Sequence, residues 1–371
     1  MKRFRANANA VKQLGRTYYS EEDILWCALS GSGIEYKFSG NKCTINIVGD
    51  SVSTREDVDN HARIGIYVNN QRVVDDMISK KDKEYVVIDE GEVIEATIKI
   101  LKLSETAMST FGIASIDVEG GTIEPTEKKN LLIEFVGDSI TCGYGVDDED
   151  PEHNFSTKTE DVTRAYAYKT AEALDADYSM VSISGYGIIS GYTTGEEPIT
   201  NQLIPQYYEK LGFSYGDFGA EKPQDIPWDF SLRQPDIVVI NLGTNDSSYT
   251  KDHEDRIALF SQEYGVFIKR IRELNPEAAI ICSLGIMGTQ LYPSIELAVN
   301  TYMVETADDN IHLLRFDEQR HEDGFVADWH PTEITHIKAA KKLVDKILYI
   351  QRKLDPSKPA IALKDELNFF K

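Results

Sequence analysis

The stretch EFVGDSITCGYG, residues 134–145, decides how the rest of this 371-residue chain is interpreted. The apolar run over residues 131–136 is typical of a buried strand, and it stops at the small polar tripeptide Gly137, Asp138 and Ser139. In an open parallel sheet, ligands bind at the carboxyl ends of the strands. A serine directly after such a strand is therefore a candidate nucleophile.

Strands and helices alternate in the second part of the chain. Predicted strands cover residues 131–136, 178–183, 236–242, 279–284 and 311–316, and predicted helices cover residues 162–174, 255–274, 294–307 and 331–353. This alternation predicts an α/β domain over residues 126–371, with a parallel sheet and helices on both of its faces. The last helix is expected to carry Pro331 in its first turn and Ile334 on its apolar face.

The first part of the chain has a different period. Short β-rich segments lie at residues 34–38, 43–48, 64–68, 85–88, 95–101 and 113–118, with turn residues between them. Several of these segments alternate apolar and polar side chains, which is the pattern of strands with one buried face. Residues 1–125 are therefore predicted to form an all-β, jelly-roll-like sandwich domain.

Composition and charge exclude several classes of partner. The chain is 41% hydrophobic and 27% charged, as expected for a globular protein, and its formal net charge is -23. Such a charge repels nucleic acid and anionic membrane surfaces, so neither is an expected partner. The basic N-terminal segment lacks the apolar region of a signal peptide, which favours a cytoplasmic protein, or a secreted one if a leader has been removed. The sequence leaves open whether the chain forms a homo-oligomer.

The four cysteines are far apart and form no C-x-x-C pair. Four reduced thiols are therefore expected. A disulfide between Cys27 and Cys43 is the alternative for a secreted protein.

Two further strand ends carry groups suited to acyl transfer. Asn245, in NLGTND, follows the strand over residues 236–242, and Gly185, in SISGYG, follows the strand over residues 178–183. Acyl transfer needs a nucleophile and hydrogen-bond donors aimed at the oxygen that becomes negative. The backbone N–H groups of Ser139 and Gly185 and the side-chain amide of Asn245 are the candidate donors. The alternative for the GTND segment is a simple turn and helix cap.

A serine nucleophile also needs a base, and the chain contains seven histidines. His330, in ADWHPT, lies between the last predicted strand and the last helix, which places it at the same sheet edge as Ser139. His336 lies inside the helix, where a surface or packing role is expected, and His61 belongs to the other domain. A structural histidine remains the alternative for His330.

These motifs together resemble a known family. The segments around Ser139, Gly185, Asn245 and His330 resemble the four blocks of the SGNH (GDSL-type) hydrolases, over roughly residues 130–350. The string GDSITCGYG, with a β-sandwich ahead of it, is similar to carbohydrate esterase family 2. The resemblance implies a flavodoxin-like α/β catalytic domain in which Ser139 is the nucleophile, Gly185 and Asn245 are oxyanion-hole donors, and His330 is the general base.

The sequence departs from the family pattern at one position. SGNH hydrolases usually carry an aspartate three residues before the histidine, but Ala327 stands there and Asp328 follows it. A third group must hold the imidazole in its working tautomer. Either the Asp328 side chain does so from its shifted position, or a backbone carbonyl does and the enzyme uses a Ser/His dyad.

The resemblance implies a serine esterase that removes acetyl groups from xylan, mannan or similar plant polysaccharides through an acetyl-enzyme, with no metal or organic cofactor required. Trp329 and Trp228 are candidates for stacking on a sugar ring, and core or rim tryptophans are the alternative. The long segment over residues 185–232 is expected to rim or cover the site. The alternatives are a short-chain acyl-lipid or thioester hydrolase with the same machinery, and a carbohydrate-binding protein with an inert hydrolase-like domain.

Overall fold

The computed structural model describes residues 1–354, and the chain divides into two compact units. Unit 1 consists of Met1–Lys128, Ser156–Glu160 and Glu209–Trp228, and unit 2 consists of Lys129–Phe155, Asp161–Tyr208 and the chain from Asp229 onward. Two segments that follow residue 128 in the sequence therefore belong to unit 1. One of them is the second half of the long connection between the strands at residues 178–183 and 236–242.

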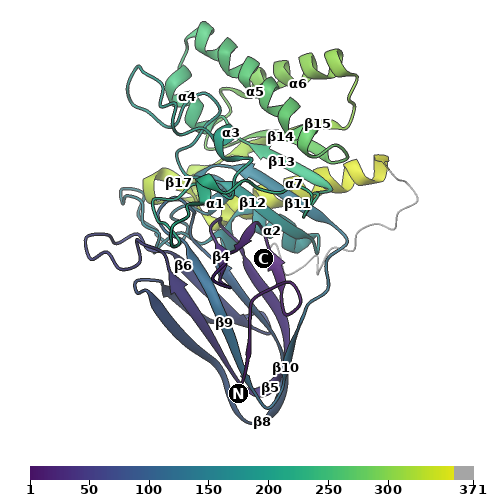
Figure 1. Ribbon diagram of the computed structural model, residues 1–371. Helices are drawn as coiled ribbons and strands as arrows, with labels where there is room; N and C mark the ends of the chain where they lie inside the picture. The colour runs from purple at the N-terminus through teal and green to yellow at the C-terminus, as the bar shows by residue number, and fades with distance from the viewer. Residues whose placement is uncertain (355–371) are drawn as a thin grey trace. The chain divides into compact units, whose positions relative to one another are not determined.

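Unit 1 is an antiparallel β-structure with ten strands in one sheet (Figure 1). The strands are β1 (Lys2–Phe4), β2 (Lys12–Leu14), β3 (Thr17–Tyr19), β4 (Leu25–Cys27), β5 (Gly33–Gly49), β6 (Arg63–Val68), β7 (Gln71–Met77), β8 (Asp82–Lys102), β9 (Phe111–Glu119) and β10 (Thr122–Pro125). The main path through the sheet is β3-β4-β9-β5-β8-β6-β7, while β1 pairs with β9 and both β2 and β10 pair with β5. The all-β sandwich expected from the sequence is confirmed.

Two long strands replace four of the short strands that the sequence predicts. Residues 34–38 and 43–48 belong to β5, and residues 85–88 and 95–101 belong to β8. The register between the two strands shifts between Gly40 and Lys42 and again between Cys43 and Thr44. Such bulges bend a strand without ending it. The turn-like residues inside β5, which indicated a loop in the sequence, therefore form a bend within one continuous strand.

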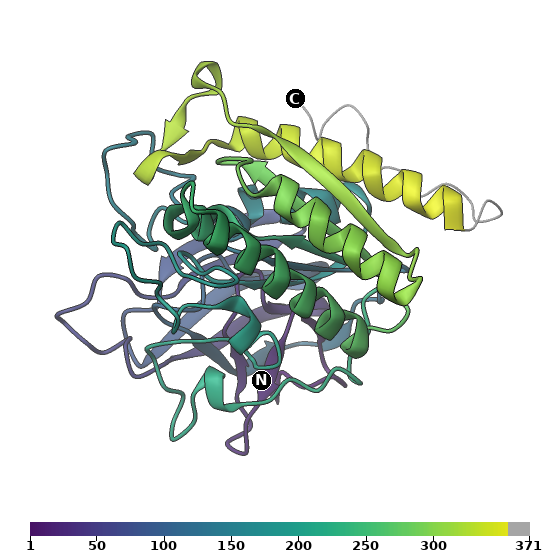
Figure 2. The same ribbon diagram turned by 90° about the horizontal axis from the view of Figure 1, so that it is seen from above.

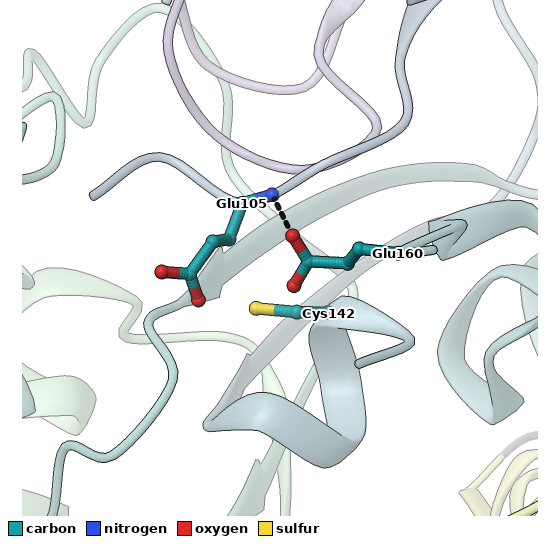
Figure 3. A group of neighbouring side chains, drawn as sticks. All are labelled: Glu105, Cys142 and Glu160. Atoms are coloured by element: carbon teal, nitrogen blue, oxygen red, sulfur yellow. Dashed lines mark hydrogen bonds between the residues drawn. The ribbon is translucent and has the colours of Figure 1, made fainter. Parts of the chain in front are cut away.

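Unit 1 buries two carboxyl groups beside each other. Glu105 and Glu160 are almost fully buried, and their carboxylate oxygens lie within 4.8 Å of one another. The backbone N–H of Glu105 donates to the Glu160 carboxylate at 2.8 Å (Figure 3). Burial, followed by the neighbouring Glu105 charge, holds the pKa of Glu160 well above its usual value. Glu160 therefore keeps its proton in the folded state at pH values where an exposed glutamate has lost it.

Unit 2 contains a parallel five-stranded sheet in the order β12-β11-β13-β14-β15. Its strands are β11 (Leu132–Gly137), β12 (Asp177–Ser182), β13 (Ile237–Asn241), β14 (Ala279–Ile286) and β15 (Ile311–Glu318), and a short hairpin is formed by β16 (Phe325–Val326) and β17 (His330–Pro331). The helices are α1 (Ser139–Cys142), α2 (Tyr166–Ala173), α3 (Ile204–Tyr207), α4 (Thr244–Thr250), α5 (Glu254–Leu274), α6 (Tyr292–Thr306) and α7 (Glu333–Leu354).

The helices of unit 2 cover both faces of its sheet, as expected. Helices α5 and α6 pack side by side, and α6 contacts strands β14 and β15 on one face of the sheet. Helices α2 and α7 pack together on the opposite face (Figures 1 and 2). The α/β fold predicted from the alternating pattern is thus confirmed. Within residues 1–354, none of the helices is both long and apolar enough to span a bilayer.

Two details of the last helix differ from the sequence expectation. Pro331 lies in β17, before the helix, because residues 330–331 pair with β16 and the helix starts only at Glu333. Ile334 is exposed, whereas Ala340, Val344 and Ile347, which continue the expected apolar face, are buried. All four cysteines are free and buried, as the reduced-thiol prediction required.

The raised pKa of Glu160 predicts how the stability of unit 1 depends on pH. Because the folded state binds this proton more tightly than the unfolded state does, stability falls as pH rises above the ordinary glutamate value of 4.5. The loss approaches about 1.4 kcal/mol for each pH unit until the folded pKa is reached. We expect Glu160→Gln to flatten this decline, as measured by urea unfolding and by hydrogen exchange in β5 at several pH values.

Glu92→Gln is the matched control, because Glu92 is an exposed glutamate of the same unit. Equal pH slopes for the wild-type protein and Glu160→Gln would contradict the assignment.

Candidate active site

The Gly137-Asp138-Ser139 tripeptide turns the chain from β11 directly into α1. A Cβ atom on Gly137 would lie 2.1 Å from the Thr141 hydroxyl oxygen, so the turn accepts only glycine there. The Asp138 side chain caps α1 by accepting from the N–H of Ile140 at 3.1 Å. Ser139 is the first residue of α1, two positions after the end of the strand. The strand stops in this way because a tight turn must present the serine at the sheet edge.

Ser139 and His330 are hydrogen-bonded. The Ser139 Oγ lies 2.9 Å from the His330 Nε2, although the two residues are 191 positions apart in the sequence. Ser139 is 7% exposed and His330 is 9% exposed, so the bond is shielded from solvent. His330 is held in the short β17 strand, where it pairs with Val326 of β16. The pairing proposed from the sequence is therefore present in the structure.

The other ring nitrogen of His330 faces two main-chain carbonyl groups. The His330 Nδ1 lies 3.2 Å from the Ala327 oxygen and 3.1 Å from the Asp328 oxygen. A carbonyl oxygen only accepts hydrogen bonds, so the neutral ring carries its proton on Nδ1. The Nε2 lone pair is then free to accept the Ser139 hydroxyl proton, which is the tautomer that a general base requires.

The Asp328 side chain does not take the orienting role that was one of the two alternatives. Its carboxylate accepts a hydrogen bond from the Tyr144 hydroxyl, and its contribution to His330 is the main-chain carbonyl. The backbone of Asp328 has φ 50° and ψ 37°, a left-handed conformation that turns this carbonyl toward the ring. Of the two alternatives considered, the structure shows the backbone-carbonyl arrangement.

The environment of His330 favours its neutral form. Burial lowers the pKa of His330 to about 4, and the two carbonyl acceptors oppose this effect only in part. The ring is thus uncharged over most of the physiological pH range and is ready to accept a proton.

The candidate oxyanion donors follow three neighbouring strands. Residues 137, 182 and 241 are paired across β12, β11 and β13, and Ser139, Gly185 and Asn245 come just after them. In residues 1–354 neither the Ser139 nor the Gly185 backbone N–H donates to another group. Gly185 has φ +79°, and no other atom lies near the position that a Cβ would take. Glycine is therefore favoured here by the backbone conformation and not by a lack of space.

Asn245 lies in α4, which Gly243 precedes as the cap residue. Its Nδ2 donates to the Tyr186 carbonyl at 2.8 Å and makes a long contact of 3.4 Å with the Asp138 carboxylate. The weaker contact is the one that a substrate oxygen can replace.

Asp246, which the sequence did not single out, fixes the loop after Gly185. Its carboxylate accepts from the backbone N–H groups of Ile188, Ile189 and Ser190. Burial raises the pKa of Asp246 to about 6 and that of Asp138 to about 7. The sequence signal was available, because Asp246 stands beside Asn245 in GTND, but its partners are backbone amides that leave no pattern in the sequence.

The two candidate tryptophans have different positions. Trp329 lies in unit 2, next to His330 in sequence, and is 50% exposed, with its ring 5.4 Å from the Phe325 ring. Trp228 belongs to unit 1, where it packs against a cluster that contains Trp26 and Phe218. Of the two, Trp329 is the one that unit 2 contains, one residue before His330. The long connection is likewise divided, since residues 185–208 belong to unit 2 and residues 209–228 to unit 1.

His336 has a packing role, which was one of the two roles expected from the sequence. It is fully buried in α7, and its Nδ1 accepts from the backbone N–H of Tyr166. Burial lowers the pKa of His336 to about 3, so it stays neutral. His61 belongs to unit 1.

Comparison with protein families agrees with this geometry. Residues 135–336, more than half of the chain, match the model of the GDSL-like lipase/acylhydrolase family. The chain belongs to this family. A second model, the carbohydrate esterase 2 N-terminal domain, matches residues 13–126. The resemblance to carbohydrate esterase family 2 noted in the sequence is thus confirmed by both parts of the chain.

Two curated relatives cover most of the chain. A cellulase/esterase CelE from Acetivibrio thermocellus is 29% identical over 342 residues, which are 90% of this chain but 38% of the relative. An acetylxylan esterase/glucomannan deacetylase from Cellvibrio japonicus is 25% identical over 347 residues, covering 92% of this chain and 88% of the relative. The chain thus spans well under half the length of the first relative.

Solved structures of related hydrolases have the same two-part architecture. A family two carbohydrate esterase from Clostridium thermocellum, solved in complex with cellohexaose, is 26% identical, with a TM-score of 0.78 over 93% of this chain and 99% of that chain. The acetyl xylan esterase Est2A from Butyrivibrio proteoclasticus shares the fold at 23% identity, with a TM-score of 0.84 over 95% and 98% of the two chains.

The lowered pKa of His330 predicts the acid side of a pH–rate profile. A general base must be neutral, so kcat/KM for an activated acetyl ester is expected to fall only as pH drops through about 4. The rate should stay level as pH decreases through the ordinary histidine range. The enzyme is kept at neutral pH and diluted into each assay buffer immediately before the rate is measured, so that the profile is recorded before acid unfolding.

Asp246→Asn and Asp138→Asn serve as controls, because burial raises the pKa of Asp246 to about 6 and that of Asp138 to about 7. A step close to pH 6.5 that persists in both variants would show that His330 has an ordinary pKa, against the prediction.

Proposed function

We propose that this chain is a serine esterase that removes O-acetyl groups from plant polysaccharides or oligosaccharides such as xylan and glucomannan. The observation that carries the proposal is the buried hydrogen bond of 2.9 Å between the Ser139 Oγ and the His330 Nε2 at the carboxyl edge of a parallel sheet. A serine paired in this way with a neutral histidine is an activated nucleophile. The arrangement needs no metal ion or organic cofactor to supply a step.

The first half of the reaction forms an acetyl-enzyme. As the Ser139 oxygen attacks the acetyl carbonyl carbon, the His330 Nε2 accepts the hydroxyl proton. The imidazolium that results is stabilised by the Ala327 and Asp328 carbonyls at Nδ1. The tetrahedral intermediate collapses when the bond to the sugar oxygen breaks, and His330 returns the proton to that oxygen. The acetyl group stays bound to the Ser139 oxygen as an ester.

The developing negative charge needs preset donors. The backbone N–H groups of Ser139 and Gly185 and the side-chain amide of Asn245 supply them, because all three residues follow adjacent strands of one sheet. Asp246 keeps the loop after Gly185 in place through its three backbone hydrogen bonds. The donors therefore need little rearrangement when the charge appears.

The second half releases acetate. Water takes the position of the sugar hydroxyl and gives a proton to the His330 Nε2 as it attacks the acetyl-enzyme. Collapse of the second tetrahedral intermediate breaks the bond to Ser139, and the proton returns to the serine oxygen. The products are acetate and the original enzyme.

Carbohydrate is the substrate class that the surroundings support. Trp329 is half-exposed beside His330, and an indole face suits the apolar C–H face of a sugar ring. The names of the relatives point the same way, since the Cellvibrio japonicus relative is an acetylxylan esterase/glucomannan deacetylase and the Clostridium thermocellum structure holds cellohexaose. The preferred sugar and the acetyl position on it are left to experiment.

Ser139→Ala is expected to abolish acetate release from acetylated xylan and acetylated glucomannan, because no other group forms the acyl-enzyme. Ser283→Ala is the matched control: Ser283 is also a buried serine of unit 2, hydrogen-bonded to the Ile240 carbonyl, and its loss should leave the rate within about twofold. A panel with p-nitrophenyl esters of increasing chain length separates the alternatives. Faster turnover of long acyl esters than of acetylated polysaccharide would favour the lipid or thioester hydrolase.

Asn245→Ala is expected to lower kcat on p-nitrophenyl acetate by about 10²- to 10³-fold with little change in KM, the effect of removing one oxyanion-hole donor. Steady-state kinetics with the soluble ester measure both constants. A loss confined to KM would place Asn245 in substrate binding and remove it from the oxyanion hole.

A further inference from the structure

Tyr144 contacts the His330 ring and the residue that orients it. The Tyr144 and His330 rings are stacked, with centroids 3.8 Å apart and planes at 17°. The Tyr144 hydroxyl donates to the Asp328 carboxylate. One buried side chain therefore covers a face of the general base and also holds the turn that carries the two Nδ1 acceptors.

The turn that Tyr144 holds is conformationally unfavourable. Asp328 has φ 50° and Trp329 has φ 59°, so two successive residues other than glycine take left-handed conformations. Aspartate tolerates this region and tryptophan rarely adopts it. This backbone path aims the carbonyls of Ala327 and Asp328 at the same ring nitrogen. Such a path persists only if surrounding groups fix it.

The two glycines around Tyr144 allow the close approach. Gly143 ends α1 with φ +79°, and Gly145 follows with φ +63°. A Cβ on Gly145 would lie 2.8 Å from the Ala327 Cβ, so a larger residue would push the two segments apart. The GYG sequence after the nucleophile is therefore shaped to fit against the turn before the histidine.

Two other hydrogen bonds hold the backbone of this turn. The His153 carbonyl accepts from the Asp328 N–H at 2.9 Å, and the Gln319 side chain donates to the Trp329 carbonyl. Within residues 1–354, the Asp328 carboxylate is hydrogen-bonded by Tyr144 alone. Tyr144 thus differs from the other anchors in reaching both the side chain of the turn and the ring.

We propose that Tyr144 is a positioning residue that keeps His330 in line with Ser139, by stacking on the imidazole and by locking the left-handed turn through Asp328. This inference rests on the proposed function, because it assigns Tyr144 a role in activating the Ser139 nucleophile. It concerns the Ser139–His330 pair and not the sugar, so it can be tested independently of the natural substrate.

The experiment compares Tyr144→Phe, which keeps the stacked ring and loses the hydroxyl, with Tyr144→Leu, which loses both. Tyr302→Phe is the matched control, since Tyr302 is a buried tyrosine of unit 2 whose hydroxyl also bonds a carboxylate, that of Asp308. The readouts are the rate at which a fluorophosphonate probe labels Ser139, the kcat and KM for p-nitrophenyl acetate, and the thermal unfolding midpoint. Probe labelling reports on the pair even if the polysaccharide proposal fails.

We expect Tyr144→Phe to lower the labelling rate and kcat by about 10-fold and Tyr144→Leu by about 100-fold, with KM unchanged, because misplacement of the base slows only the chemical step. Tyr302→Phe should keep the wild-type rate and lose as much thermal stability as Tyr144→Phe. Asp328→Ala should match Tyr144→Phe, and the double variant should be no slower than either single variant.

Three results would overturn the proposal. The first is a wild-type labelling rate in Tyr144→Phe, which is the decisive variant because it is the less disruptive of the two. The second is an equal loss of activity in Tyr302→Phe, which would make the effect one of general stability. The third is multiplication of the Tyr144→Phe and Asp328→Ala effects in the double variant, which would show that the two residues act independently.

Discussion

The hydrogen bond between the Ser139 Oγ and the His330 Nε2 is the constraint on which the rest of unit 2 depends. It joins residues 191 positions apart, and it can form only if the first strand of the sheet and the last crossover end at the same edge. The parallel order of β11 to β15 meets that condition. Neighbouring features act on this bond: burial keeps the ring neutral, and two carbonyl groups select its tautomer. The candidate donors follow three adjacent strands of the same sheet.

The sequence predicted those parts of the site that are side chains at strand ends. Ser139, Asn245 and His330 stood out because polar residues followed apolar strands in the correct order, and the parallel fold follows from the same pattern. The sequence did not decide between the two alternatives for the group that orients His330. That group is a pair of backbone carbonyl groups, which every residue has. Their direction depends on left-handed φ angles at Asp328 and Trp329, which the residue types in the sequence A-D-W do not predict.

Long-range organisation explains the other differences. The strands β5 and β8 were expected in pieces, because residues such as Gly40 indicate turns in isolation but form bulges when a partner strand continues past them. Trp228 and Trp329 were both candidates for stacking on a sugar ring. The segment Glu209–Trp228 folds with unit 1, and membership of a unit depends on tertiary contacts that local patterns do not contain.

The use of peptide carbonyls at Nδ1 has a consequence for how this site tolerates mutation. A carboxylate that serves as the third member of a triad disappears with one codon change, whereas the oxygens of Ala327 and Asp328 remain whatever side chains stand there. Selection on this function therefore acts on the shape of a loop. A substitution at residue 327 is therefore tolerated as long as the chain can still follow its left-handed path, whereas residue 328 is also constrained by the hydrogen bond that its carboxylate accepts from Tyr144. Identity at residue 327 is thus a poor guide to whether a related chain has kept its chemistry.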